Sequence, residues 1–134
     1  FLDSPNLFTM ILNRRIAHHK YYLSLLNYMV IEWLKFTVNS QSREKFIQQD
    51  EAIWTASLST YPGFLGKEVW IEPHAPEQII MTIRWHTREQ WKSIPLKDLA
   101  AIEQRFSAAM GKMNINYKMT ESKEFQIRKF PSNQ

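Results

Sequence analysis

The sequence predicts an α+β domain of the ferredoxin-like class, with elements in the order β-α-β-β-α-β. Three observations predict it: four segments rich in β-branched and aromatic residues, two segments with helical spacing between them, and a length of 134 residues that suits one domain. Hydrophobic residues make up 44% of the chain, which is enough to build one core. Two such helices would cover one face of a four-stranded antiparallel sheet.

The first strand and the first helix are predicted between residues 30 and 63. Val30–Val38 is β-branched and aromatic (VIEWLKFTV), which is typical of a strand. Asn39–Ser42 supplies turn and capping residues, and helical spacing follows over Arg43–Tyr61. The Pro62–Gly63 pair then ends the predicted helix.

Two strands and a helix cap are predicted next. The strands are Phe64–Ile71 and Gln78–Trp85, and a proline-containing turn separates them. Thr87 then begins the sequence T-R-E-Q, a capping box in which Gln90 can reach back to the helix cap.

The second helical region extends to about Met110, and Pro95 divides it because proline suits the first turn of a renewed helix. Gly111 is the expected C-cap, and Tyr117–Phe130 is the predicted last strand. The helical region carries apolar residues with the spacing of one buried face: Trp91, Ile94, Leu99, Ile102, Phe106 and Met110.

Composition argues against several classes of site. The chain has no Cys, which removes disulfides, thiolate metal sites and cysteine nucleophiles. Its 17 Lys and Arg against 13 Asp and Glu give a net charge of +4, with acids and bases interspersed after residue 28. This pattern argues against a dedicated nucleic-acid surface, and no residues have a convincing metal-ligand spacing. No apolar run approaches the roughly 20 residues of a membrane span, so we expect a soluble cytoplasmic protein.

Residues 1–28 differ from the rest of the chain. They contain one acidic residue and the pairs Arg14–Arg15 and His18–His19, without a helical or alternating period. Three interpretations are open: a poorly ordered arm, the remainder of an acid-poor targeting segment, or translated sequence upstream of a true start at Met29. The position of Met29 immediately before the first strand favours the last of these. We therefore expect one domain over residues 29–131 and a tail over residues 132–134.

Strand alternation and the helix positions leave one face of the predicted sheet uncovered. The apolar residues expected on that open face are Ile31, Trp33, Leu65, Val69, Ile71 and Ile80. Together they are too apolar to remain in water as one patch. The sequence therefore predicts a homodimer in which two sheets pack face to face.

Five segments carry a resemblance to a known family: VIEWLKF, FIQQDEAIW, YPGFLGKEVW, IRWHTREQWKSIP and ESKEFQIRKFP. Together they resemble a small, mainly cyanobacterial family of dimeric α/β-barrel proteins related to the antibiotic-biosynthesis monooxygenase superfamily. The resemblance covers about residues 29–131. It implies a dimeric α/β barrel, in a superfamily that includes cofactor-independent monooxygenases, haem-degrading oxygenases and proteins without assigned activity.

The same resemblance locates a pocket between the sheet and the helices. Haem-degrading relatives have a Trp at the position of Trp85, which matches, and an Asn near the position of Glu32, which does not. They take an axial His from the second helical region, yet Thr87–Lys112 contains none. Haem is therefore disfavoured, and no cofactor is expected.

Asp50 is an anomaly in the first helix because its nearest neighbours on the helix surface are apolar. Those neighbours are Phe46, Ile47, Ile53 and Trp54. An acid in this setting is either partly buried or lines a cavity, and burial without a partner raises its pKa. Strand alternation also turns Glu32 toward the helices. One hypothesis is that Asp50 and Glu32 act as bases beside Trp85 in a cavity for a flat phenolic or quinol-type substrate, with Trp54, Phe36 and Met81 as further contacts.

Two functional classes remain open. The first is a cofactor-independent monooxygenase, or at least a binder of a small aromatic molecule. The second is a non-catalytic homodimeric interaction module, in which Asp50 accepts a hydrogen bond from a Trp indole or pairs with Arg84 or Lys35. An open cavity around Asp50 favours the first class, and a filled core favours the second.

Overall fold

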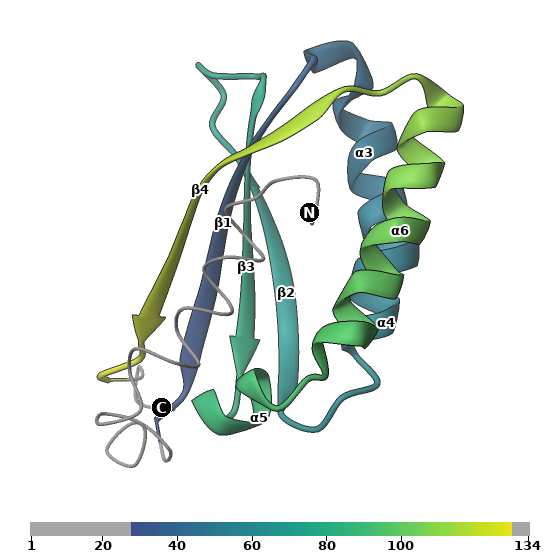
Figure 1. Cartoon of the computed structure of the whole chain (residues 1–134). Helices are drawn as coiled ribbons and strands as arrows, with labels where there is room; N and C mark the ends of the chain where they lie inside the picture. The colour runs from purple at the N-terminus through teal and green to yellow at the C-terminus, as the bar shows by residue number, and fades with distance from the viewer. Residues whose placement is uncertain (1–27, 130–134) are drawn as a thin grey trace.

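The computed structural model describes residues 28–129, which form one open antiparallel sheet with helices on one face (Figure 1). The order of its strands is β2-β3-β1-β4. They are β1 (Val30–Val38), β2 (Phe64–Ile71), β3 (Gln78–Trp85) and β4 (Tyr117–Gln126). The predicted ferredoxin-like class is therefore confirmed. Apart from Tyr28, the predictions for residues 1–28 and for residues 132–134 lie outside the described residues.

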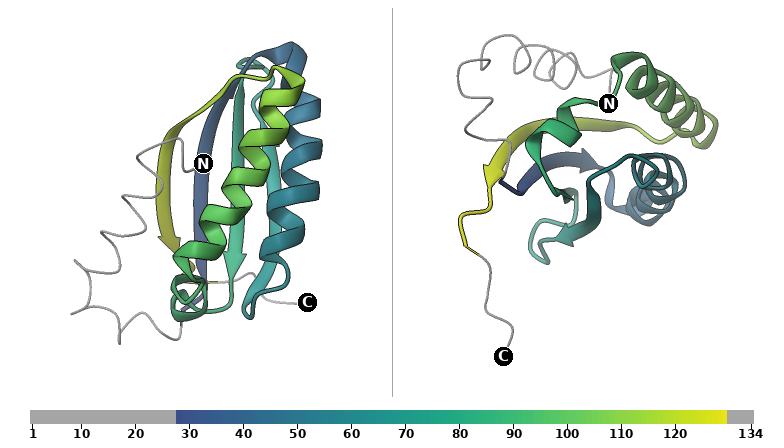
Figure 2. Two further views of the ribbon diagram at one scale, coloured as in Figure 1. Left: turned by 45° about the vertical axis from the view of Figure 1, so that its right-hand side comes forward. Right: turned by 90° about the horizontal axis from the view of Figure 1, so that it is seen from below.

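Two helical rods lie side by side against the sheet (Figure 2). The first consists of a 3-10 turn, η1 (Ser40–Ser42), α3 (Arg43–Asp50), a π-helical segment, η2 (Glu51–Thr55), and α4 (Ala56–Leu58). The helix predicted over residues 43–61 therefore has the right place but stops at residue 58 and contains a π-helical turn. The second rod is α6 (Leu96–Met113), which follows the short α5 (Arg88–Lys92).

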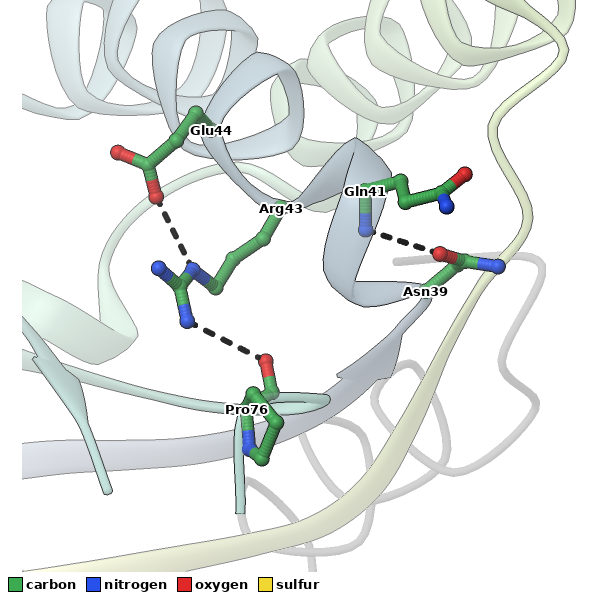
Figure 3. Close-up of polar contacts among 5 residues, drawn as sticks. All are labelled: Asn39, Gln41, Arg43, Glu44 and Pro76. Atoms are coloured by element: carbon green, nitrogen blue, oxygen red, sulfur yellow. Dashed lines mark hydrogen bonds and ion pairs between the residues drawn. The ribbon is translucent and has the colours of Figure 1, made fainter. Parts of the chain in front are cut away.

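The start of the first rod is fixed by local hydrogen bonds (Figure 3). The Asn39 side chain accepts from the Gln41 backbone N–H at 2.9 Å, which caps η1. Arg43 donates from Nε to Glu44 at 3.0 Å and from Nη1 to the Pro76 carbonyl oxygen at 3.5 Å. The predicted turn and capping segment is thus tied to the loop between β2 and β3.

The core lies between the sheet and the two rods. Alternate residues of β1, from Val30 through Glu32 to Val38, are buried against the helices. The partner face of β3 contributes Ile79, Met81, Ile83 and Trp85. Every member of the predicted apolar stripe of the second helical region is also buried. The predicted inner faces of β1, β3 and the second helical region are therefore confirmed.

The end of α6 corrects one prediction. The helix continues past Gly111 to Met113, and Asn114 takes the left-handed conformation with φ 55°. The Asn114 N–H donates to the Gly111 carbonyl, and the Ile115 N–H donates to the Met110 carbonyl. This is the Schellman pattern with Asn114 at C′, so glycine is not required there.

The start of β2 corrects another prediction. Phe64 pairs with Trp85 and Gly66 pairs with Arg84, so Leu65 is an extra residue in a β-bulge. The bulge reverses the alternation, and Val69 and Ile71 consequently pack against the core. Their predicted place on the open face was wrong, because period-two counting across a bulge assigns the wrong face.

The last strand is shorter than predicted. β4 ends at Gln126, which pairs with Val30 at the beginning of β1. A further backbone bond follows, from the Ile127 N–H to the Met29 carbonyl. β4 therefore ends level with the first residue of its antiparallel partner β1. Among the described residues, no helix combines the length and the apolar character needed to cross a membrane.

Candidate functional site

Glu32 and Trp85 meet at one end of the sheet. The Trp85 indole donates from Nε1 to Oε1 of Glu32 at 3.5 Å. Trp85 is fully buried, and its ring packs edge-on against Phe64 at 5.7 Å between centroids. Glu32 is also buried, with 8% of the residue exposed. The structure thus brings these two residues into contact, while the cavity predicted beside them stays a prediction.

Glu124 extends this group onto the neighbouring strand. Its Cα pairs directly with that of Glu32, so two carboxylates lie side by side on the helix-facing side. Arg88 of α5 offsets their negative charge and donates from Nε to Glu124 Oε2 at 2.6 Å. The Glu124 side chain is 19% exposed, whereas the Arg88 side chain is buried. Glu124 therefore links the Glu32 end of the core to solvent.

The short helix α5 carries two buried cations, Arg88 and Lys92. Thr87 accepts from the Gln90 backbone N–H at 3.1 Å, which confirms the predicted N-cap. Gly63 lies so close to Gln90 that an added Cβ would stand 2.7 Å from the Gln90 Cβ. Arg88 and Lys92, one turn apart, are both buried, and Lys92 Nζ stands 3.7 Å from the Trp91 ring centroid. The turn before β2 thus positions α5 over the carboxylates.

Asp50 occupies a different part of the core. Its Oδ2 forms an ion pair with Nζ of Lys67, a residue of the edge strand β2. The two side chains are 1% and 2% exposed, respectively. Burial raises the pKa of the Asp50 carboxyl above its ordinary value of 3.8, and the Lys67 ammonium opposes this rise. Asp50 is therefore buried, which is one of the two expected settings, and its ion-pair partner is Lys67 rather than Arg84 or Lys35.

Lys67 was missed because of the bulge at Leu65. Simple alternation groups Lys67 with Leu65 on the open face, whereas the observed register pairs Lys67 with Ile83 on the core side. Ile83 also pairs with Glu32, so Lys67, Ile83 and Glu32 form one row across the sheet. Glu32 is consequently two strands away from the partner of Asp50.

A second buried acid, Glu103 on α6, also escaped the sequence analysis. It is 2% exposed and accepts from the Tyr117 hydroxyl at 3.0 Å. The available signal was the same as for Asp50, because Leu99 precedes Glu103 by four residues and Phe106 follows it by three. Buried acids therefore occur on both helical rods.

The remaining predicted contact residues lie in the core. Trp54, Phe36 and Met81 are buried, and Phe36 packs against Phe46 with 5.5 Å between ring centroids. Their proposed contact with a substrate stays a prediction. Within residues 28–129, no group of three or more His, Cys, Asp or Glu is arranged to hold a metal ion.

Comparison with known proteins supports the fold. Residues 29–93 match the family Antibiotic biosynthesis monooxygenase. A Chloroflexus aurantiacus protein whose given name refers to the same family is 24% identical, with 78% of this chain and 97% of that chain covered and a TM-score of 0.53. No curated protein matches the sequence.

Two further structures share this fold. A variant of SnoaB, a cofactor-independent oxygenase from Streptomyces nogalater, is 16% identical, with 76% of this chain and 95% of that chain covered and a TM-score of 0.53. A conserved protein from Methanosarcina mazei is 15% identical, with coverages of 82% and 99% and a TM-score of 0.50. At these identities the likeness concerns the fold alone.

Proposed function

We propose that this chain, whose family match and fold support membership in the antibiotic biosynthesis monooxygenase superfamily, is a cofactor-independent monooxygenase acting on a small phenolic or quinol-type molecule. The fold likeness to SnoaB, a cofactor-independent oxygenase, is consistent with this proposal. The narrower resemblance to a mainly cyanobacterial family stays a prediction.

The pairing of Glu32 with Trp85 carries the proposal. An indole N–H fixes one carboxylate oxygen at 3.5 Å, at the end of the core where Glu124 is 19% exposed. A base must come within hydrogen-bond reach of the proton that it accepts. Among the three buried acids described above, Glu32 combines an orienting aromatic N–H with a neighbouring carboxylate that reaches solvent.

The proposed reaction needs no group beyond substrate and dioxygen. Glu32 accepts the phenolic proton, and the resulting phenolate donates electrons to dioxygen. One oxygen atom joins the ring carbon para to the original oxygen, and the other leaves as water. Overall, a phenol with a para hydrogen and one dioxygen molecule give a para-quinone and one water. Trp85 supplies an aromatic wall for the flat ring.

Asp50 has a structural role in this proposal. Its ion pair with Lys67 is sealed from solvent and joins α3 to the edge strand β2. A base in that position would have to exchange its proton through the core. We therefore assign the role of base to Glu32 alone, whereas the sequence analysis proposed both Asp50 and Glu32 as bases.

We also propose that two copies pair through the open face of the sheet. Trp70 and Phe125 are nearly half exposed on this face, where their Cα partners are Ile80 and Ile31. Acidic and basic side chains are also present there, including Glu121 and Lys123, which form an ion pair at 3.1 Å. A twofold arrangement of such a face can bury apolar groups and match opposite charges.

The activity test compares Glu32→Gln with Glu44→Gln, which removes an exposed carboxylate at the far end of the sheet. Dioxygen uptake and quinone absorbance are followed with a panel of phenols and naphthols. We expect Glu32→Gln to lower kcat by about 100-fold or more, because a positioned base contributes that much. Glu44→Gln should match the wild type. Equal turnover of both variants would contradict the assignment of Glu32.

The dimer test introduces charge into the open face with the double variant Trp70→Glu and Phe125→Glu. Sedimentation velocity should show a dimer for the wild type and a monomer for this variant. Met113→Glu is the matched control, because Met113 is an exposed apolar residue at the end of α6. A wild-type monomer, or dissociation by the control alone, would contradict the proposed interface.

A non-catalytic homodimeric module is the second candidate. The observation that favours it is the buried ion pair of Asp50 with Lys67, in which an acid on the helix serves packing and charge balance. This candidate predicts a dimer that neither binds nor oxidises any phenol in the panel. Saturable binding of one phenol that depends on Glu32 would exclude it.

A further inference from the structure

A small hollow lies on the open face of the sheet, away from the Glu32 site. Its volume is about 170 Å³. The residues that line it come from three adjacent strands: Ile31, Leu65, Gly66, Lys67, Glu68, Thr82 and Arg84. Gly66, Arg84 and Ile31 form one row across the sheet, and Glu68 and Thr82 belong to the next row. These rows face away from the helices.

The floor of the hollow is the bulge in β2. Gly66 has φ +144°, and a Cβ added to it would meet no atom within 4 Å. Glycine therefore permits the backbone conformation and leaves the space open. Leu65 is the extra residue of the bulge, and such a residue is left out of the strand ladder.

The side chains around this floor favour a negative ligand group. The Arg84 guanidinium offers several N–H donors in a fork that matches a carboxylate, and Thr82 adds a hydroxyl. Ile31 and Leu65 supply apolar surface beside these donors. Glu68 also lines the hollow, and its Oε1 accepts from the Trp70 indole at 2.9 Å. That fixed carboxylate opposes a second negative charge in the ligand.

We propose that this hollow binds a small organic monocarboxylate with a flat apolar body. The carboxylate lies against Arg84 and Thr82, and the body lies against Ile31 and Leu65. The volume corresponds to about six molecules of liquid water and is below the range of drug-sized pockets. A compact acid such as benzoate has the appropriate character, and a dianion does not.

This site is separate from the proposed reaction centre. Neighbouring residues of a strand point to opposite faces, so Glu32 and Ile31 serve different sides of the sheet. The hollow does lie on the face that we propose for the dimer. Its polar and charged lining suits a carboxylate better than an apolar side chain of a second copy.

The test titrates benzoate into the full chain and follows backbone amides by NMR. The amides of Gly66, Glu68, Thr82 and Arg84 should shift in a saturable manner. Arg84→Gln should weaken binding by about tenfold or more, because it removes a charge-assisted carboxylate contact. Arg43→Gln is the matched control, since Arg43 contacts Glu44 and Pro76 outside the hollow, and it should bind as the wild type does.

A charge-selectivity measurement sharpens the test. The wild type should bind phthalate, a dicarboxylate, more weakly than benzoate, and Glu68→Gln should reduce this difference. Absence of saturable benzoate binding would overturn the proposal, as would wild-type affinity in Arg84→Gln or shifts at other amides alone. Thr82→Val provides a second variant if Arg84→Gln does not fold. Sedimentation velocity in the same buffer measures dimerisation independently. Failure of the dimer proposal can therefore be distinguished from failure of the proposed carboxylate site.

Discussion

Asp50 and Glu32 are both acids turned toward the layer between sheet and helices, yet the structure gives them opposite surroundings. Asp50 is sealed and has a full counter-charge in Lys67. Glu32 accepts from an indole N–H, lies beside the carboxylate of Glu124 and is 8% exposed. The comparison teaches that a buried acid is assigned by its partners, because similar local patterns can serve stability or chemistry.

The energetic difference follows from these partners. Removing two charges from water costs several kcal/mol per ion, and a close ion pair repays that cost only partly. Loss of one member of the Asp50–Lys67 pair should therefore lower the free energy of unfolding more than replacement of both members. The Gln side chain in Glu32→Gln keeps an oxygen that can accept from the Trp85 indole N–H, so neutralising Glu32 should affect chemistry more than folding.

The largest effect is expected for Lys67→Met, which leaves the Asp50 charge buried without its cation. We expect a loss of about 3–5 kcal/mol in the free energy of unfolding at pH 7, measured by urea denaturation. The folded-state pKa of Asp50 is raised, so the folded state holds its proton to higher pH than the unfolded state. Lys67 lowers this pKa in the wild type, so the variant raises it further, and the loss relative to the wild type should grow as pH rises above the raised wild-type pKa. A pH-independent loss would contradict the burial of this charge.

An intermediate effect is expected for Gly63→Ala, which acts on the other region by disturbing α5. Gly63 has φ +92°, and the added Cβ would stand 2.7 Å from the Gln90 Cβ. Strain and overpacking should cost about 1–3 kcal/mol. Because α5 carries Arg88, the variant should also alter the Glu32 site, seen as an upfield or downfield shift of the Trp85 indole proton. An unchanged Trp85 indole signal would contradict the proposed influence of α5 on the Glu32 site.

Much of the fold followed from sequence because its signals are local. The bounds of the first three strands were predicted to the residue, since each is a β-branched and aromatic run with clear turns. The buried stripe of the second helical region was equally plain. The end of α6 was predicted less well, because Asn114 and not the expected Gly111 takes the left-handed conformation.

The site was harder to predict because its decisive contacts are not local. Glu32 and Trp85 were grouped correctly through strand alternation and the family resemblance. Lys67 was lost because one bulge residue reversed the face of the rest of β2. Glu124 and Arg88 meet only through the pairing of β1 with β4 and the packing of α5, which no short sequence pattern encodes.

The most direct test of the contrast between the two acids is the double variant Asp50→Leu and Lys67→Met, which replaces the sealed ion pair with apolar side chains. Urea denaturation and dioxygen uptake are measured on the same preparation. We expect the double variant to recover most of the stability that Lys67→Met loses, because exchanging a whole buried ion pair is often neutral. It should also oxidise phenols at the wild-type rate, whereas Glu32→Gln does not. A stable double variant without turnover would contradict the structural role of Asp50 and return it to the reaction.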